Sequence, residues 1–125
     1  MPARINELLA RLNEAPDKLH SDHTPAVEEL IAQGETVIAP VLPYAADGDE
    51  PTRMRAQRVL EGITMASLGF VPGKGWPDAA AEDRWRALWH SLGDLDWRAP
   101  AAQRVHAIAL WQAWLACEQT RSGGR

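Results

Sequence analysis

The sequence predicts an all-α protein of about six antiparallel, paired helices. Apolar residues recur three and four positions apart in several segments, whereas sustained strand-like alternation is absent. Proline and glycine interrupt the periodic segments at short intervals, as expected for helices joined by short loops. With 125 residues, 46% of them hydrophobic, the chain is long enough for one domain with its own core. We therefore expect one domain over residues 1–119 and a frayed C-terminal tail at 120–125.

Two helices are predicted before residue 35. The segment 2–12 places four apolar side chains on one helical stripe, namely Ile5, Leu8, Leu9 and Leu12. A polar stretch, 13–23, links it to the second helix. Thr24 is a typical N-cap, and Pro25 suits the first helical position because its missing N–H would have no partner there. Gly34 is a typical residue at which such a helix ends.

Two further helices are predicted between residues 35 and 67. In the segment 35–46, Pro40 and Pro43 each remove a main-chain hydrogen bond, so we expect this helix to be kinked or to start late. The segment 52–67 has a clear apolar face, formed by Ala56, Val59, Leu60, Ile63 and Ala66. Its opposite face is expected to expose polar residues, among them Arg53, Gln57, Arg58 and Glu61.

Two helices are predicted after residue 75, in the part of the chain that contains all six tryptophans. The Gly- and Pro-rich segment 69–77 predicts a loop, after which Asp78 caps a helix that ends at Gly93. Pro100 opens the last helix. Because tryptophan buries more apolar area than other side chains, we expect this region to contribute much of the packing, with Trp111 in the core.

The last helix has two apolar faces. The bulky face is expected to lie in the core and consists of Ile108, Leu110, Trp111, Trp114 and Leu115. The second face carries small residues and could receive another helix, from this chain or from a second copy in a homodimer; it consists of Val105, Ala109, Ala113 and Ala116. Cys117 lies in the same apolar run and is expected to be buried and unreactive.

An approximate repeat relates the two halves of the chain. Asp47 and Asp49 correspond to Asp94 and Asp96 at an offset of 47 residues, each pair in a turn followed by a proline and a helix. That offset matches the repeat length of about 40–47 residues found in arrays of helix pairs.

The first of these units resembles a HEAT repeat. In that family a proline kinks the first helix, and an aspartate in the turn and an arginine in the second helix form a ladder between neighbouring repeats. Pro40, Asp47 and Arg53 match those positions. The second unit departs from the pattern, because Pro100 stands in place of the arginine and Arg104 follows one turn later. The resemblance implies a short HEAT-like α-solenoid that binds other macromolecules along a helical face.

Charge and hydropathy narrow the classes of partner. The net charge of −4 argues against a general nucleic-acid binder, which usually has a positive surface. The longest apolar run, Val105 to Cys117, has 13 residues and is too short to span a bilayer, so no membrane partner is expected. A single cysteine excludes an intramolecular disulfide and fits a reducing compartment, so we expect a cytoplasmic protein.

Two alternative functions rest on clusters of polar residues. His20, Asp22 and His23 have the residue types of a zinc site, which would make the chain a small metal-dependent enzyme or metal-binding protein. The simpler interpretation is that Asp22 and its neighbours cap the following helix. A strip of basic side chains could instead bind nucleic acid; it would comprise Arg53, Arg55, Arg58, Arg84 and Arg86.

The interpretation that we favour is a non-catalytic protein–protein interaction module, a scaffold or adaptor without a cofactor. No nucleophile motif of recognised spacing occurs in the chain. On the segment 52–67, an outward face is expected to carry Met54, Arg58, Glu61 and Met65. Methionines beside charged groups suit a partner surface because their side chains adapt in shape. We therefore predict that a partner protein binds these four residues.

Overall fold

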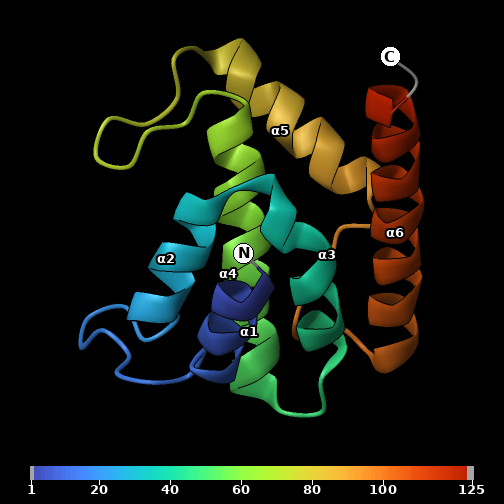
Figure 1. Cartoon of the computed structure of the whole chain (residues 1–125). Coiled ribbons are helices and arrows are strands. Elements are labelled where there is room, and N and C mark those ends of the chain that lie inside the picture. Colours follow the sequence, from blue (N-terminus) through green and yellow to red (C-terminus); the bar gives the residue numbers. More distant parts are fainter. Residues whose placement is uncertain (1, 124–125) are drawn as a thin grey trace.

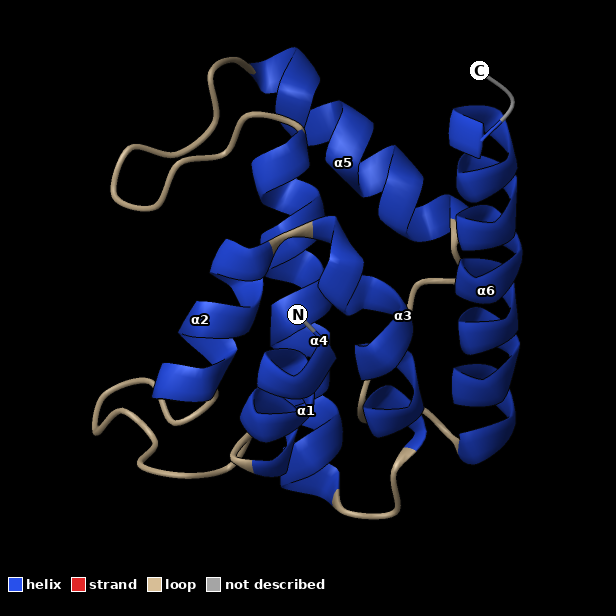
Figure 2. Ribbon diagram, in the orientation of Figure 1, coloured by secondary structure: helices blue, strands red, loops and turns tan. Residues whose placement is uncertain are grey.

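The computed structural model describes the main chain of residues 2–123 and the side chains of residues 3–118. Over this range the chain consists of helices and loops, with one isolated bridge between Val71 and Gly75 and no strand (Figure 2). The α-helices are α1 (Pro2–Ala10), α2 (Pro25–Gln33), α3 (Ile38–Val41), α4 (Glu50–Ser67), α5 (Ala79–Ser91) and α6 (Ala101–Gly123). Two 3₁₀ helices, η1 (Glu35–Val37) and η2 (Leu42–Ala46), flank α3. The predicted all-α class is confirmed.

The predicted helix starts are confirmed by their capping hydrogen bonds. The Thr24 hydroxyl accepts from the Val27 amide at the start of α2, and the same hydroxyl donates to the Leu12 carbonyl. The Asp78 carboxylate accepts from the Ala81 amide, 2.8 Å away, at the start of α5. These caps satisfy amides that have no partner inside a first helical turn, which explains why local sequence signals located them.

The proline-containing segment 35–46 is broken as expected. It divides into η1, the single turn α3 and η2, because Pro40 and Pro43 cannot donate the hydrogen bonds of a continuous helix. The short pieces nevertheless bury the apolar residues of the segment, namely Val37, Ile38, Val41, Leu42 and Ala45. The broken helix therefore serves as a wall of the core.

Helix α4 is the centre of the fold (Figure 1). It packs against α2 and against the α3–η2 segment, and η2 in turn packs against α6. Val59 and Leu60 of α4 are fully buried. At Gly62, α4 approaches α2 so closely that a Cβ atom there would lie 2.5 Å from Cδ1 of Ile31. The core thus lies around α4 rather than between equivalent helix pairs.

A continuous series of aromatic rings connects the 69–77 loop, α5 and α6. Its neighbouring ring centroids lie 5.2–6.1 Å apart, in the order Phe70, Trp76, Trp85, Trp89, Trp111 and Trp114. Such spacings are typical of attractive edge and tilted ring contacts. Trp111 is fully buried, and the Trp85 indole donates to the Thr64 hydroxyl of α4. The expectation that tryptophans provide the packing of this region is confirmed.

The end of α6 differs from expectation. The helix extends to Gly123, beyond the residue at which we expected the domain to end, while residues 124–125 of the predicted tail lie outside the described residues. Cys117 is exposed, so the prediction that it is buried is wrong. The small-residue face is also at the surface, with Val105 61% exposed.

We predict that Trp111→Ala lowers the free energy of unfolding by about 3–5 kcal/mol, or prevents folding, because it empties a fully buried site. Val105→Ala, on the exposed side of the same helix, should change it by no more than about 0.5 kcal/mol. Urea titrations of the two variants compare these values. A loss within about 1 kcal/mol for Trp111→Ala would contradict the packing described above.

The turn between α5 and α6 supplies a second stability prediction. Gly93 has φ +96°, and a Cβ atom there would lie 2.9 Å from Cα of Ala107 in α6, whereas Gly73, with φ +84°, has open space around it. Alanine at either position incurs the left-handed backbone penalty, and only Gly93→Ala adds a clash. We expect Gly93→Ala to be less stable than Gly73→Ala by about 1–3 kcal/mol in urea unfolding. Equal losses would show that α6 does not lie so close to this turn.

Candidate functional site

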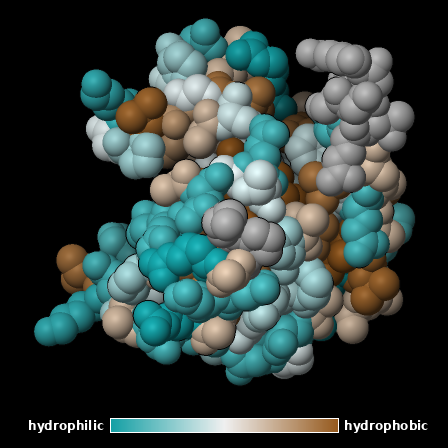
Figure 3. Space-filling view, in the orientation of Figure 1, coloured by the Kyte–Doolittle hydropathy of each residue, from teal (hydrophilic) through white to brown (hydrophobic). Residues whose placement is uncertain are grey.

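A groove of about 800 Å³ opens between the 13–23 loop, α2, α4 and the 69–77 loop. The space-filling view shows a notch at its left edge, between the surfaces formed by those two loops (Figure 3). Its apolar lining includes Ile31, Gly62, Met65, Ala66, Phe70 and Pro72. Its charged or titratable lining comprises Asp17, His20, His23, Glu28, Arg58 and Glu61. Both kinds of residue are thus contributed by segments distant in sequence.

The spacing of the α4 residues explains how one helix lines the groove. Arg58, Glu61, Gly62 and Met65 follow the three- and four-residue spacing of one helical face, and Ala66 lies beside Met65. From Arg58 to Ala66 the helix rises about 12 Å. Because Gly62 has no side chain, α2 can lie close to α4 there and place Ile31 in the lining. The groove therefore runs along about two turns of α4.

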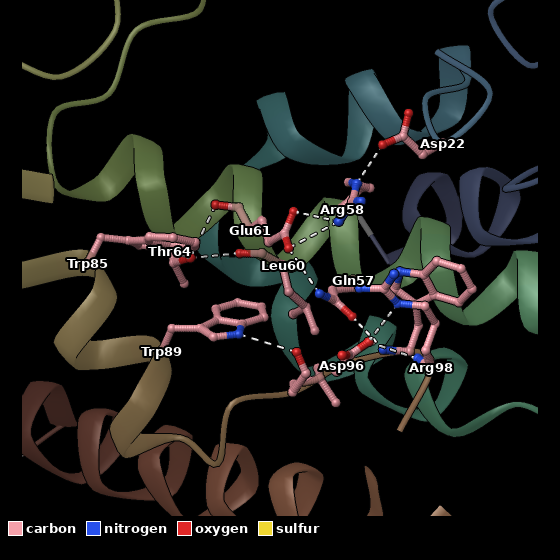
Figure 4. Close-up of polar contacts among 12 residues, drawn as sticks. Asp22, Gln57, Arg58, Leu60, Glu61, Thr64, Trp85, Trp89, Asp96 and Arg98 are labelled. Atoms are coloured by element: carbon pink, nitrogen blue, oxygen red, sulfur yellow. Dashed lines mark hydrogen bonds and ion pairs between the residues drawn. The ribbon is translucent and has the colours of Figure 1, made fainter. Parts of the chain in front are cut away.

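An ionic triad lies at the charged side of the groove, with Arg58 between Asp22 and Glu61 (Figure 4). Arg58 Nε donates to Asp22 Oδ2 over 2.6 Å, and its Nη1 donates to Glu61 Oε1 over 2.9 Å. Burial disfavours the charge of Arg58, but both carboxylates outweigh it and raise the pKa of Arg58. Burial likewise opposes ionisation of Asp22, yet the guanidinium lowers the pKa of Asp22. Arg58 and Asp22 therefore both stay ionised.

Buried polar side chains connect this triad to the turn between α5 and α6. Gln57 Nε2 donates to Glu61 Oε2, and Gln57 Oε1 accepts from the Trp97 amide over 2.7 Å. Arg53 Nε donates to the Trp97 carbonyl over 3.0 Å. We expected Arg53 and Gln57 to be exposed, and this prediction is wrong: both are less than 10% exposed. Main-chain groups of a distant turn supply the partners that allow their burial.

The 13–23 loop is attached to α4 by a second buried arginine. Arg55 donates to the Ser21 carbonyl through Nε and Nη2, and its Nη1 donates to Asn13 Oδ1 over 2.8 Å. Within the loop, the Leu19 and His20 amides donate to Asp17 and lower the pKa of its carboxyl. The loop is thereby held in one conformation beside the groove, with Asp17 ionised.

The structure does not assemble the zinc site considered from the sequence. Asp22 binds Arg58, and His23 Nδ1 lies 2.5 Å from Glu28 Oε2. Over the described residues, no three His, Cys, Asp or Glu side chains are placed so that they could hold a metal ion. His20 and His23 instead line the groove. The side chains of this loop are therefore not arranged as the predicted zinc site requires.

The arginine strip is likewise not formed. Arg53 and Arg55 are buried, Arg58 is paired within the triad, and Arg86 pairs with Glu82 on the surface of α5. A strip that binds phosphates needs these guanidinium groups at the surface. The nucleic-acid alternative thus loses three of its five arginines, and only Arg84 and Arg86 remain exposed, on α5.

Three of the four predicted partner-binding residues line the groove. Arg58, Glu61 and Met65 belong to its lining, whereas Met54, which is half-buried, does not. Sequence reasoning missed Ile31 and Phe70, which come from other segments. One available signal was Gly62, because glycine inside a regular helix costs about 1 kcal/mol relative to alanine and indicates close packing or function.

No protein-family model, no curated protein and no solved structure matches this chain. Within the described part of the chain, none of the helices has the length and apolar character required to cross a bilayer.

We predict that the Asp22–Arg58 pair contributes to acid sensitivity. Because the folded-state pKa of Asp22 lies below its ordinary value of 3.8, its stabilisation is present above that value and lost as the pH falls through the folded pKa. From about pH 5 to about pH 2, the free energy of unfolding should therefore fall less steeply in Arg58→Met than in the wild type. The comparison uses urea unfolding at each pH.

Arg86→Met is the matched control for this measurement. It removes an arginine from an exposed pair with Glu82, of the kind that contributes little to stability. Its pH profile should follow the wild type. Identical profiles for the two variants would show that the triad does not influence the ionisation of Asp22.

Proposed function

We propose that the protein is a non-catalytic interaction module, a scaffold or adaptor, that accepts a segment of another protein in the groove. The observation that carries the proposal is the groove itself: apolar lining from α2, α4 and the 69–77 loop, bordered by charged side chains held in fixed positions. Apolar surface supplies binding free energy, and a surrounding polar rim supplies specificity. The cytoplasmic location expected from the single cysteine belongs to the same proposal.

The order of the charged lining supports a binding role. Arg58 is held by two carboxylates, and Asp17 by two main-chain amides. Side chains that are already ordered lose little conformational entropy when a partner binds. The groove is therefore better suited to recognition than a surface whose long charged side chains must first be immobilised.

A short HEAT-like arrangement forms part of the proposal. Arg53 donates to the Asp47 carbonyl, and Arg104 donates to the Ala99 carbonyl, so each arginine binds the turn that precedes its own helix. Arg53 also donates to Trp97 in the second turn. These contacts support two units built on a similar plan, although the acceptors are main-chain carbonyls rather than the aspartate carboxylates of the resemblance.

A display selection with unbiased random peptides tests this function. Wild-type protein is the target, Ala66→Trp fills the groove with a large ring, and Ala109→Trp adds the same ring to an exposed site on α6. Both alanines are exposed, so neither substitution overpacks the core. We expect selected peptides to bind wild type and Ala109→Trp, and to bind Ala66→Trp at least about tenfold more weakly.

Peptides that bind all three proteins equally, or a selection without enrichment, would contradict the proposed function. Sedimentation velocity distinguishes a further outcome, in which a second copy of the chain occupies the groove. Self-association that disappears in Ala66→Trp but persists in Ala109→Trp would replace the partner protein with a homodimer.

A further inference from the structure

We propose that the segment bound by the groove is an amphipathic helix with lysine or arginine at the edges of its apolar face. This inference rests on the proposed function and names the chemistry of the partner. Three observations carry it: most polar side chains of the groove already have partners, the groove follows about two turns of α4, and its acidic side chains outnumber the single arginine.

The first observation decides between a helical and an extended partner. An extended peptide needs hydrogen-bond partners for its main chain, which it commonly finds at the edge of a sheet. The groove is built from helices and loops, and most of its polar side chains bind one another or nearby amides, as in Arg58 with Glu61 and Asp17 with Leu19. A helix satisfies its main chain internally and needs only an apolar surface. The groove therefore favours a helix.

The second observation concerns length. The lining of α4 extends from Arg58 to Ala66, about 12 Å along the helix axis. A bound helix presents apolar side chains over that distance at positions i, i+3 or i+4, and i+7. Met65, Ile31 and Phe70 offer flexible and aromatic surface against which such side chains can pack.

The third observation is charge. Asp17, Glu28 and Glu61 line the groove against the one guanidinium of Arg58, which is shared between Asp22 and Glu61. The surrounding segment 13–31 contains five Asp or Glu and a single Lys. The side chain of Glu28 contacts His23 Nδ1 but is 62% exposed, so it can exchange that contact for one with an incoming cation. A basic partner is therefore attracted and an acidic one repelled.

Three synthetic peptides of about 18 residues, or five helical turns, test the inference. The first carries leucine at i, i+3, i+4 and i+7 with lysines flanking the stripe. The second replaces those lysines with glutamates. The third keeps the composition of the first but places its leucines at alternating positions, which removes the helical stripe. Binding is measured by fluorescence anisotropy of the labelled peptides at about 0.15 M salt, so that long-range attraction is screened.

We expect the first peptide to bind at least about tenfold more tightly than either of the others. Its affinity should fall about two- to fivefold in Glu28→Gln and stay unchanged in Glu35→Gln, a matched charge change at an exposed site outside the groove lining. Ala66→Trp should weaken binding at least about tenfold, and Ala109→Trp should not.

The inference is overturned if the glutamate peptide or the alternating peptide binds as tightly as the first. It is also overturned if Glu28→Gln and Glu35→Gln act alike, or if Ala66→Trp leaves binding unchanged. The random-peptide selection separates this failure from that of the proposed function. If the selection yields groove-dependent peptides that are acidic or extended, the groove still binds peptides and only the inference of a basic helix is overturned. If the selection yields no groove-dependent peptide, both the proposed function and this inference are overturned.

Discussion

The burial of arginine side chains on α4 is the interaction on which the rest of the structure depends. Arg53 and Arg55 are less than 10% exposed, and a buried guanidinium is costly unless its donors have acceptors. Those acceptors are mainly main-chain carbonyls, at Asp47 in the turn before α4 and at Ser21 and Trp97 in two distant loops. One helix thereby orders three connections, each of which would otherwise be a surface loop with few constraints.

The groove is a consequence of this ordering. Arg55 holds the 13–23 loop against α4, and Arg58 adds the contact to Asp22 in the same loop. Without these bonds the polar loop would have little apolar burial to restrain it. The proposed binding site thus lies beside a loop that polar side chains of α4 hold in place.

Local signals located most of the helices, because they act within one or two turns. Thr24 and Asp78 cap the helices at which we expected them, and the prolines of the segment 35–46 break it as predicted. The prediction that Trp111 lies in the core is also confirmed. In each case the physical cause lies in the residue itself. Proline lacks an N–H group, threonine and aspartate carry a short side chain with an oxygen that can cap a helix, and tryptophan has a large apolar ring.

The groove could not be predicted in the same way. Helical periodicity predicts that polar residues opposite the apolar face lie at the surface, and for that reason we expected Arg53 and Gln57 to be exposed. Their partners are main-chain groups, which every residue carries and which leave no signature in the sequence. Cys117 shows the converse error, because an apolar helical run does not reveal whether a neighbour covers its last turns. Helical periodicity could group Arg58, Glu61 and Met65, because they lie on one face of a single helix. It could not add Ile31 and Phe70, because these residues come from other segments and reach the groove only in the folded chain.

The two walls of the groove are held to the core by different forces. The 13–23 loop is fixed by charged hydrogen bonds to Arg55 and Arg58, while the 69–77 loop is fixed by the ring contact of Trp76 with Trp85, with Phe70 packed on Trp76. Ionic contacts in partly buried positions weaken only modestly with salt, and aromatic burial is hardly affected by it. The shape of the groove should therefore persist at salt concentrations that screen attraction to a partner. In the function that we propose, shape and charge are separable contributions to recognition, the apolar wall selecting a helix and the acidic wall selecting its basic edge.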